Sequence, residues 1–133
     1  MATAIDSSVL LDVLLADPAH LAASEAALRA AVAQGDLLVG EVVLAEIAPV
    51  LPGGTIREFL SDWRIQFVPS SVESAILAGE MYRLYLERGG KRGRVVPDFL
   101  IAAHAQIHAG SLLARDRGYY RDYFQGLNLV EPR

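Results

Sequence analysis

Short apolar segments alternate along the chain with longer segments that have the hydrophobic period of a helix. Each short segment is rich in aliphatic residues and ends near polar or turn-forming residues, which favours buried strands. No two-residue hairpin signal joins any two of them, so helices are expected to connect the strands. The pattern predicts a three-layer α/β/α sandwich around a central, mainly parallel β-sheet. The expected strands are Ala2–Ile5, Leu37–Val39, Ile65–Val68, Leu112–Ala114 and Leu127–Val130.

Two local signals predict where helices begin. Asp17-Pro18 combines a cap residue with the residue preferred at the first helical position. It predicts a helix to Gln34, followed by a left-handed exit at Gly35. Ser70 and Glu73 have the spacing of a capping box, which predicts the start of another helix.

A further helix is predicted to begin at Pro97-Asp98. Proline lacks the backbone N–H that the first turn leaves unpaired, and an aspartate suits the positive end of the helix dipole. Ile101, Ala102, Ala105 and Ala109 lie within about 60° of Asp98 on a helical wheel, so this face is apolar and mostly small. A neighbouring backbone is therefore expected to approach this face closely.

Composition narrows the class of protein. The 133 residues include no cysteine, which excludes disulfides and thiolate metal sites and fits a reducing, cytoplasmic location. No apolar run is long enough to span a membrane, and no signal peptide is visible. The net charge of −4, from 12 Lys and Arg against 16 Asp and Glu, argues weakly against a nucleic-acid partner. That argument loses its force if the acids bind metal ions.

Four acidic residues are expected at one edge of the predicted sheet. Asp6 directly follows the first strand, and Asp116 follows the fourth. Asp98 begins the helix that leads into the fourth strand, so it starts from the same edge. Ligands of open parallel sheets bind beyond the carboxyl ends of the strands, which makes these acids candidates for one shared site.

The fourth acid, Glu46, has an unusual helical environment. Val42, Val43 and Val50 lie within about 60° of it, so it occupies the middle of an apolar stripe. Charged residues are seldom buried without a partner, and none of its helix neighbours is basic. Taken singly, each acid also has an ordinary explanation as a helix cap or as the partner of an arginine.

A cluster of carboxylates without histidine or cysteine suits a hard divalent cation such as Mg²⁺. Such a site lowers the pKa of a bound water and stabilises a phosphate during in-line displacement, which predicts phosphodiester hydrolysis. Basic residues beside it would bind the nucleic-acid backbone, or are simply a solvated surface. The candidates for this basic rim are Lys91, Arg92, Arg94, Arg115, Arg117 and Arg121.

The order of four short motifs resembles the PIN domain, and in particular its VapC-type toxins. The motifs are Asp6-Ser7-Ser8, Ala45-Glu46-Ile47, Pro97-Asp98-Phe99-Leu100-Ile101-Ala102-Ala103 and Arg115-Asp116-Arg117, with Gly126-Leu127-Asn128-Leu129-Val130 closing the chain. The resemblance covers essentially the whole chain and implies a single PIN-like nuclease domain over residues 1–133. It also implies an Mg²⁺- or Mn²⁺-dependent endoribonuclease that is the toxin of a type II toxin–antitoxin pair.

On this resemblance, Asp6, Glu46, Asp98 and Asp116 are the metal-binding and catalytic residues. The family also implies a homodimer and a cognate antitoxin that inserts a segment toward the site. One position departs from the family pattern, which often has Ser or Thr two residues before the last aspartate, where this chain has Ala114. Hydrogen bonds to the acids would then come from Ser7 or Ser8, and Asp122 is a substitute for Asp116.

Other interpretations use different residues. His104 and His108 have the i, i+4 spacing of a two-histidine metal site, but they lack the accompanying glutamate and point away from Asp98, which favours surface or core histidines. A metal-free ribonuclease acting through histidine would leave a cyclic phosphate. Aspartyl-phosphate chemistry of the phosphatase kind requires a second aspartate where Ser8 stands.

Two interpretations keep the fold without the toxin activity. One is a PIN-fold protein that binds or processes RNA and is not a toxin. The other is a catalytically inactive interaction module, with tyrosines such as Tyr82 and Tyr85 as a partner surface. The presence of all four acids favours an active nuclease over the inactive module.

Overall fold

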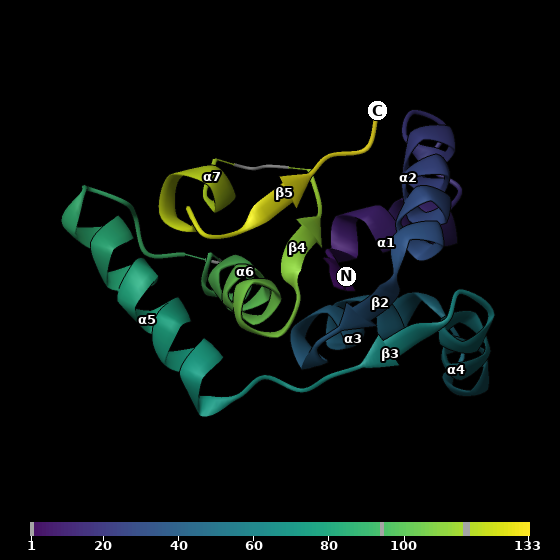
Figure 1. The fold of residues 1–133 in the computed structure, drawn as a ribbon, viewed down its shortest axis with the longest axis horizontal. Coiled ribbons are helices and arrows are strands. Elements are labelled where there is room, and N and C mark those ends of the chain that lie inside the picture. Colours follow the sequence, from purple (N-terminus) through teal and green to yellow (C-terminus); the bar gives the residue numbers. More distant parts are fainter. Residues whose placement is uncertain (1, 94, 116–117) are drawn as a thin grey trace.

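The computed structural model describes residues 2–93, 95–115 and 118–133 and has a five-stranded sheet at its centre (Figure 1). The strand order is β3-β2-β1-β4-β5, and every neighbouring pair is parallel. This arrangement confirms the predicted α/β sandwich with a parallel sheet. The strands are β1 (Ala2–Ile5), β2 (Asp36–Val39), β3 (Ile65–Phe67), β4 (Gly110–Leu113) and β5 (Asn128–Val130).

Helices fill the connections between the strands and cover both faces of the sheet. Figure 1 shows α1 and α2 on one side of the sheet and α5, α6 and α7 on the other. In the part of the chain that the structure describes, no helix combines the length and apolarity needed to cross a membrane. The helices are α1 (Ser7–Leu14), α2 (Leu21–Gln34), α3 (Glu41–Ile47), the 3₁₀ helix η1 (Ala48–Val50), α4 (Gly53–Asp62), α5 (Val72–Glu87), α6 (Val96–His108) and α7 (Tyr120–Tyr123).

The connections reverse direction between β1 and β4. From β1 the chain moves outward to β2 and β3, then returns across the sheet to β4 and continues to β5. The carboxyl ends of β1 and β4 therefore lie side by side, and the backbone N–H of Asp6 donates to the carbonyl of Leu113 at 3.0 Å. Such a switch point leaves a crevice between diverging connections, which is where ligands of open parallel sheets bind.

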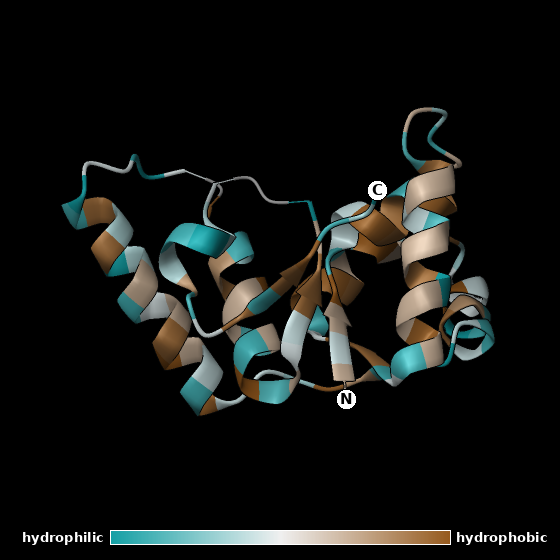
Figure 2. Cartoon of the chain, turned by 45° about the horizontal axis from the view of Figure 1, so that its top comes forward, coloured by the Kyte–Doolittle hydropathy of each residue, from teal (hydrophilic) through white to brown (hydrophobic). Residues whose placement is uncertain are grey.

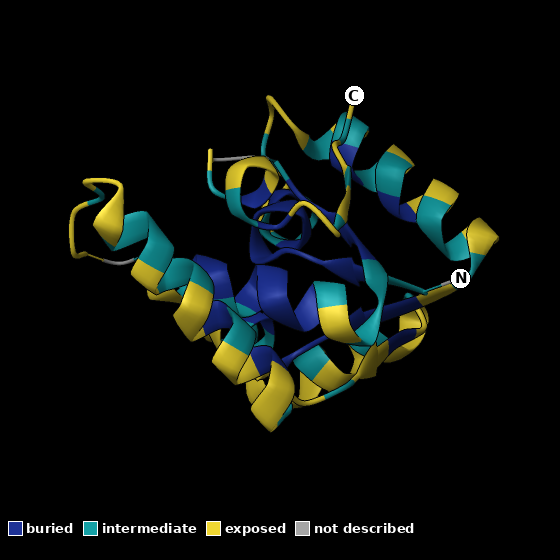
Figure 3. Ribbon diagram, turned by 60° about the vertical axis from the view of Figure 1, so that its left-hand side comes forward, coloured by how far each residue is buried: buried dark blue, intermediate teal, exposed yellow. Residues whose placement is uncertain are grey.

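The central strands and α6 form most of the core. Figure 2 shows apolar residues concentrated along the strands, and Figure 3 shows strands and much of α6 as buried. Ile101, Ala102 and Ala105 are all less than 5% exposed, which confirms the predicted apolar face beside Asp98. Small side chains on this face let α6 pack closely against the sheet.

The helix α2 ends at Gln34, as predicted, but its predicted start and the predicted conformation of its exit are wrong. The helix begins at Leu21, because Asp17 caps a turn in which its carboxylate accepts from the N–H of Ala19 at 3.0 Å. The exit through Gly35 is extended, with φ of 166°, and is not left-handed. The chain enters β2 directly at the next residue, so an extended conformation is required there.

The cap of α5 is one residue later than predicted. Ser71 is the cap, and its hydroxyl accepts from the N–H of Ser74 at 3.1 Å. In return, the N–H of Ser71 donates to the hydroxyl of Ser74. Ser70 is instead bound to Glu41 on α3, with its hydroxyl 2.7 Å from Oε1. A tertiary contact thus determines the role of Ser70, which local spacing does not reveal.

Candidate metal centre

Asp6 lies where β1 passes into α1, at the switch point of the sheet. It is the N-cap of α1, with an extended backbone (φ −75°, ψ 151°), and is only 1% exposed. Its Oδ2 accepts hydrogen bonds from the N–H of Ser8, at 3.3 Å, and from the Ser8 hydroxyl. Its Oδ1 lies 3.4 Å from the hydroxyl of Tyr120. These neutral donors orient the carboxylate.

Glu46 meets the start of α1 through Ser7, whose hydroxyl donates to Oε1 at 2.9 Å. The prediction that Glu46 sits in a buried apolar stripe is wrong, because Glu46 is exposed and the buried residues of α3 are Val43 and Ile47. The α-helix ends at Ile47 and tightens into a 3₁₀ turn, so Val50 does not continue the stripe. Glu46 therefore reaches the Asp6 segment from solvent at the sheet edge.

Asp98 lies in the first turn of α6 and is 8% exposed. Because α6 leads into β4, which is parallel to β1, its first turn is on the side of the sheet where Asp6 lies. The predicted ligand Asp116 lies outside the described residues. Its substitute, Asp122, is exposed in the first turn of α7.

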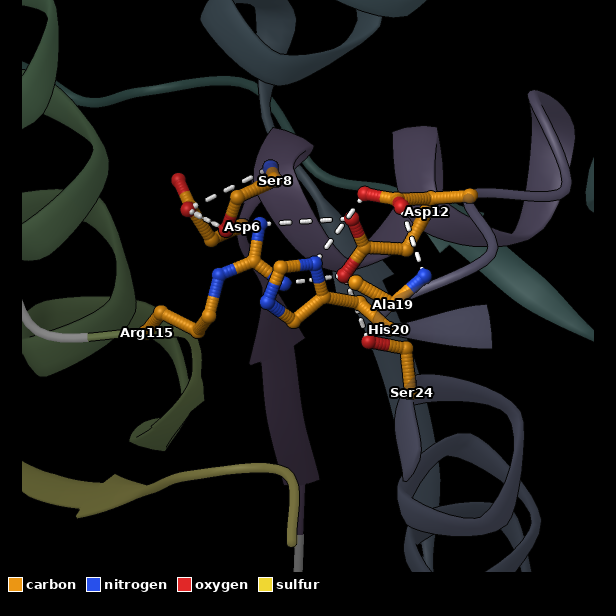
Figure 4. Close-up of polar contacts among 8 residues, drawn as sticks. Asp6, Ser8, Asp12, Ala19, His20, Ser24 and Arg115 are labelled. Atoms are coloured by element: carbon orange, nitrogen blue, oxygen red, sulfur yellow. Dashed lines mark hydrogen bonds and ion pairs between the residues drawn. The ribbon is translucent and has the colours of Figure 1, made fainter. Parts of the chain in front are cut away.

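An ion pair that was not predicted from the sequence lies next to this edge. Arg115, two residues after the end of β4, makes two hydrogen bonds to Asp12 of α1, one of them from Nη2 to Oδ1 at 3.2 Å (Figure 4). Asp12 is 4% exposed and also accepts from the hydroxyl of Ser24 at 2.7 Å. The hydrogen bond with Asp12 raises the pKa of Arg115 above its ordinary value. Asp12 interrupts an apolar run in the sequence, which was the available signal for a buried, paired carboxylate.

Asp12, Asp17 and His20 form the compact acidic group among the described residues, with ligand atoms within 4.8 Å of one another. Asp6, Glu46 and Asp98 do not form a group that tight in the described ranges. The Asp12 group is close enough to bind a metal ion, yet its atoms already have partners: Arg115 contacts Asp12, and Asp17 Oδ2 lies 3.0 Å from Nδ1 of His20. The hydrogen bond from His20 lowers the pKa of Asp17.

The donor chemistry of Asp6, Glu46 and Asp98 fits a hard cation. All three offer carboxylate oxygens, the donors that Mg²⁺ prefers, and Mg²⁺ usually keeps several waters in addition to one or two carboxylates. Two oxygens bound directly to one Mg²⁺ at about 2.1 Å lie no more than about 4.2 Å apart, so in this arrangement some of the three carboxylates would reach the ion through its bound waters.

The candidate residues of the basic rim differ in their surroundings. Lys91 and Arg92 are exposed in the loop before α6, whereas Arg94 and Arg117 lie outside the described residues. Arg115 is engaged by Asp12, and Arg121 lies 3.4 Å from Glu131.

His104 is a core residue. It is 4% exposed, and its Nε2 lies 2.6 Å from the carbonyl of Val68, so that nitrogen is already in use. Burial lowers the pKa of His104, which favours a neutral ring. The centroids of the His104 and His108 rings are 5.0 Å apart. This geometry supports the interpretation of the histidines as structural.

A family assignment agrees with the fold and with this arrangement of acids. Residues 3–124 match the family model of the PIN domain. The chain belongs to the PIN domain family. The resemblance seen in the four sequence motifs is thereby confirmed at the level of the family. Among curated protein sequences, none matches this PIN domain.

Solved structures share the fold of this PIN domain at low sequence identity. A chain of VapBC2 from Rickettsia felis, bound to a DNA fragment from their promoter, has 17% identity and a TM-score of 0.76, with both chains covered in full. VapBC-1 from nontypeable Haemophilus influenzae has 17% identity and a TM-score of 0.72, with 98% of each chain covered. A toxin–antitoxin complex from Klebsiella pneumoniae has 20% identity and a TM-score of 0.68, with the same coverage. At these identities the likeness establishes the fold.

Proposed function

We propose that this PIN domain is a metal-dependent endoribonuclease and the toxin of a type II toxin–antitoxin pair. The observation that carries the proposal is the PIN-domain match over residues 3–124 in a chain whose Asp6 and Asp98 are buried at the carboxyl edge of a parallel sheet. Carboxylate oxygens are the ligands that Mg²⁺ prefers, so acids at this edge of the sheet suit a hard divalent cation. The structural likeness to VapBC complexes supports the toxin assignment.

Asp6, Glu46, Asp98 and Asp116 are the proposed ligands of Mg²⁺ or Mn²⁺. When bound, the ion would supply an activated water and stabilise negative charge on the scissile phosphate. The protein contributes the orientation of the ligands: Ser8 orients Asp6, and Ser7 orients Glu46 through hydrogen bonds. The short reach of aspartate at a strand end and at a helix start keeps the carboxylates at fixed positions on rigid elements.

The RNA backbone is proposed to bind beside the acids. Lys91 and Arg92 are exposed in the loop before α6, so their cations are available to phosphates. Arg115 is better assigned to its ion pair with Asp12, since breaking that pair would leave a buried carboxylate. Arg94, Arg117 and Arg121 stay candidates for backbone contacts.

A cognate antitoxin is the proposed protein partner, because similar structures contain a VapBC or a toxin–antitoxin complex. A homodimer is proposed from the family resemblance. Val72 and Ile76, one turn apart on α5, are 76% and 56% exposed, and a second copy would remove such apolar surface from water. A toxin acting on cellular RNA is placed in the cytoplasm.

The test is cleavage of a structured RNA by the purified chain with Mg²⁺ and with EDTA. Wild-type protein should cleave only with metal and leave 5′-phosphate and 3′-hydroxyl ends, whereas attack by a 2′-hydroxyl leaves a cyclic phosphate. Asp98→Asn should lower the rate by about 100-fold or more, because it removes a charged ligand worth several kcal/mol. Asp62→Asn, at the exposed end of α4, is the matched control and should retain activity.

Cleavage that persists in EDTA, or that survives Asp98→Asn, contradicts the metal mechanism. Binding of RNA without cleavage in either Mg²⁺ or Mn²⁺ would instead support the catalytically inactive module. Cleavage by a protein whose expression is harmless to the host would support a PIN-fold RNA-processing enzyme that is not a toxin.

A further inference from the structure

Tyr120 places a buried hydroxyl next to Asp6. The residue is 1% exposed and is the first residue of α7, whereas Asp6 follows β1, 114 positions earlier in the chain. Its hydroxyl lies 3.4 Å from Oδ1 of Asp6, which is longer than the roughly 2.5–3.0 Å of a typical O–H···O hydrogen bond, so the contact is a weak one in this geometry. A phenol buried this deeply requires polar partners for its hydroxyl, so the contact constrains where α7 lies.

The two oxygens of Asp6 have different surroundings. Oδ2 accepts from the N–H and the hydroxyl of Ser8, whereas Oδ1 faces Tyr120. A carboxylate oxygen has two lone pairs, so Oδ1 keeps one for a cation while it accepts from Tyr120. Because both oxygens have donors, the carboxylate resists rotation about its Cβ–Cγ bond. The direction of the remaining lone pair on Oδ1 is therefore fixed.

The same short helix, together with the cap residues Tyr119 and Phe124 on either side of it, packs against the neighbour of Asp98. The ring of Phe99 lies 5.7 Å from Tyr119, 5.6 Å from Tyr123 and 5.8 Å from Phe124, measured between centroids. Phe99 is fully buried and follows Asp98 directly on α6. Thus α7 contacts Asp6 through a hydroxyl and the Asp98 turn through aromatic rings.

We propose that Tyr120 is a positioning residue for the metal ligand Asp6, and that α7 sets the spacing between Asp6 and Asp98. This inference rests on the proposed function, because it concerns two of the proposed ligands. If Tyr120 only fills space, Tyr120→Phe will leave metal binding unchanged. If its hydroxyl positions Asp6, the same substitution will weaken metal binding.

The test compares Tyr120→Phe with Tyr123→Phe, which removes a hydroxyl three residues away on the same helix. Mn²⁺ binding to the purified full-length chain is measured from the electron paramagnetic resonance signal of free Mn²⁺, with circular dichroism as the check of folding. Tyr120→Phe should weaken Mn²⁺ binding by about 10-fold, as removal of a hydrogen-bond partner of a metal ligand does. Tyr123→Phe should bind as the wild type does.

Phe124→Leu tests the spacing by a route that leaves the Tyr120 hydroxyl in place. Phe124 is 2% exposed and packs on Phe99, so the smaller side chain loosens α7 and should also weaken Mn²⁺ binding. Unchanged affinity in Phe124→Leu overturns the spacing role. This variant keeps the proposal testable even if Tyr120→Phe does not fold.

The outcomes separate this inference from the proposed function. If wild type binds Mn²⁺, Asp6→Asn abolishes binding and Tyr120→Phe binds normally, the positioning role is overturned while the metal centre stands. If wild type does not bind Mn²⁺, or Asp6→Asn binds as well as wild type, the metal centre itself is overturned, and the inference with it.

Discussion

Replacing Arg115 with methionine should destabilise the protein by leaving Asp12 charged and buried. The Asp12 side chain is 5% exposed, and Arg115 supplies its two charge-assisted hydrogen bonds. Breaking a fully buried ion pair costs about 3–5 kcal/mol. The Arg115 side chain is 37% exposed, so water screens part of the interaction, and a loss of about 2 kcal/mol is expected.

Urea denaturation followed by the fluorescence of Trp63 measures this loss as a shift of the midpoint at constant slope. The matched control is Arg83→Met, which removes an arginine from the exposed pair with Glu87 on α5. That pair has side chains 72% and 54% exposed, and its loss should cost no more than about 0.5 kcal/mol.

The double variant Asp12→Asn/Arg115→Met tests the cause of the loss. Asparagine carries no charge and still offers an oxygen to the Ser24 hydroxyl, so the double variant should be more stable than Arg115→Met alone by about 1 kcal/mol. Arg115 does not stabilise the fold by compensating a buried charge if Arg115→Met is within about 0.5 kcal/mol of wild type in stability, or if the double variant is no more stable than the single one.

Three further outcomes follow from the structure. Burial lowers the pKa of His104 below 6.5, so its imidazole binds a proton more tightly in the unfolded chain than in the folded one. The stability that the neutral His104 contributes is therefore complete above about pH 6.5 and declines as the pH falls. Between about pH 7.5 and about pH 5.5, the urea midpoint should decline less for His104→Gln than for wild type. Gly40→Ala would place a Cβ 3.0 Å from the His104 ring and should cost about 1–3 kcal/mol in the same assay, whereas Gly79→Ala meets nothing within 4 Å and should gain about 0.5–1 kcal/mol. Saturating Mg²⁺ at about 100 times its Kd should stabilise wild type by about 2.7 kcal/mol and leave the melting temperature of Asp6→Asn unchanged; an equal rise in both proteins would place the ion elsewhere.

The sheet was predictable because each strand has a local signature. Five short apolar runs with no hairpin turn between them favour parallel pairing, and every neighbouring pair in the structure is parallel. The position of Asp6 followed from the same reasoning, since a residue after a parallel strand lies at the carboxyl edge. Local periodicity was less informative for Glu46. The helical wheel assumed an α-helix as far as Val50, whereas the chain forms a 3₁₀ turn from Ala48.

The contacts around the acids were not predictable, because they join distant parts of the chain. Arg115 and Asp12 are 103 positions apart, and Ser7 and Glu46 are 39 apart. Which arginine meets which acid depends on the strand order, and no local pattern in the sequence encodes that order. Arg115 was accordingly grouped with the loop cations as a candidate for RNA binding.

The way in which each carboxylate is compensated separates the acids into two kinds. Asp12 meets a full positive charge from Arg115, so a metal ion would gain little attraction there without first displacing the guanidinium. Asp6 and Glu46 accept hydrogen bonds from the hydroxyls of Ser8 and Ser7, which orient the carboxylates, and within the described residues neither acid forms an ion pair with a lysine or an arginine. The charge of Arg115 acts on Asp6 as well, but without the direct contact that it makes with Asp12. Oriented carboxylates are what a divalent cation requires. This difference favours the Asp6 edge over the more compact Asp12 group as the metal centre.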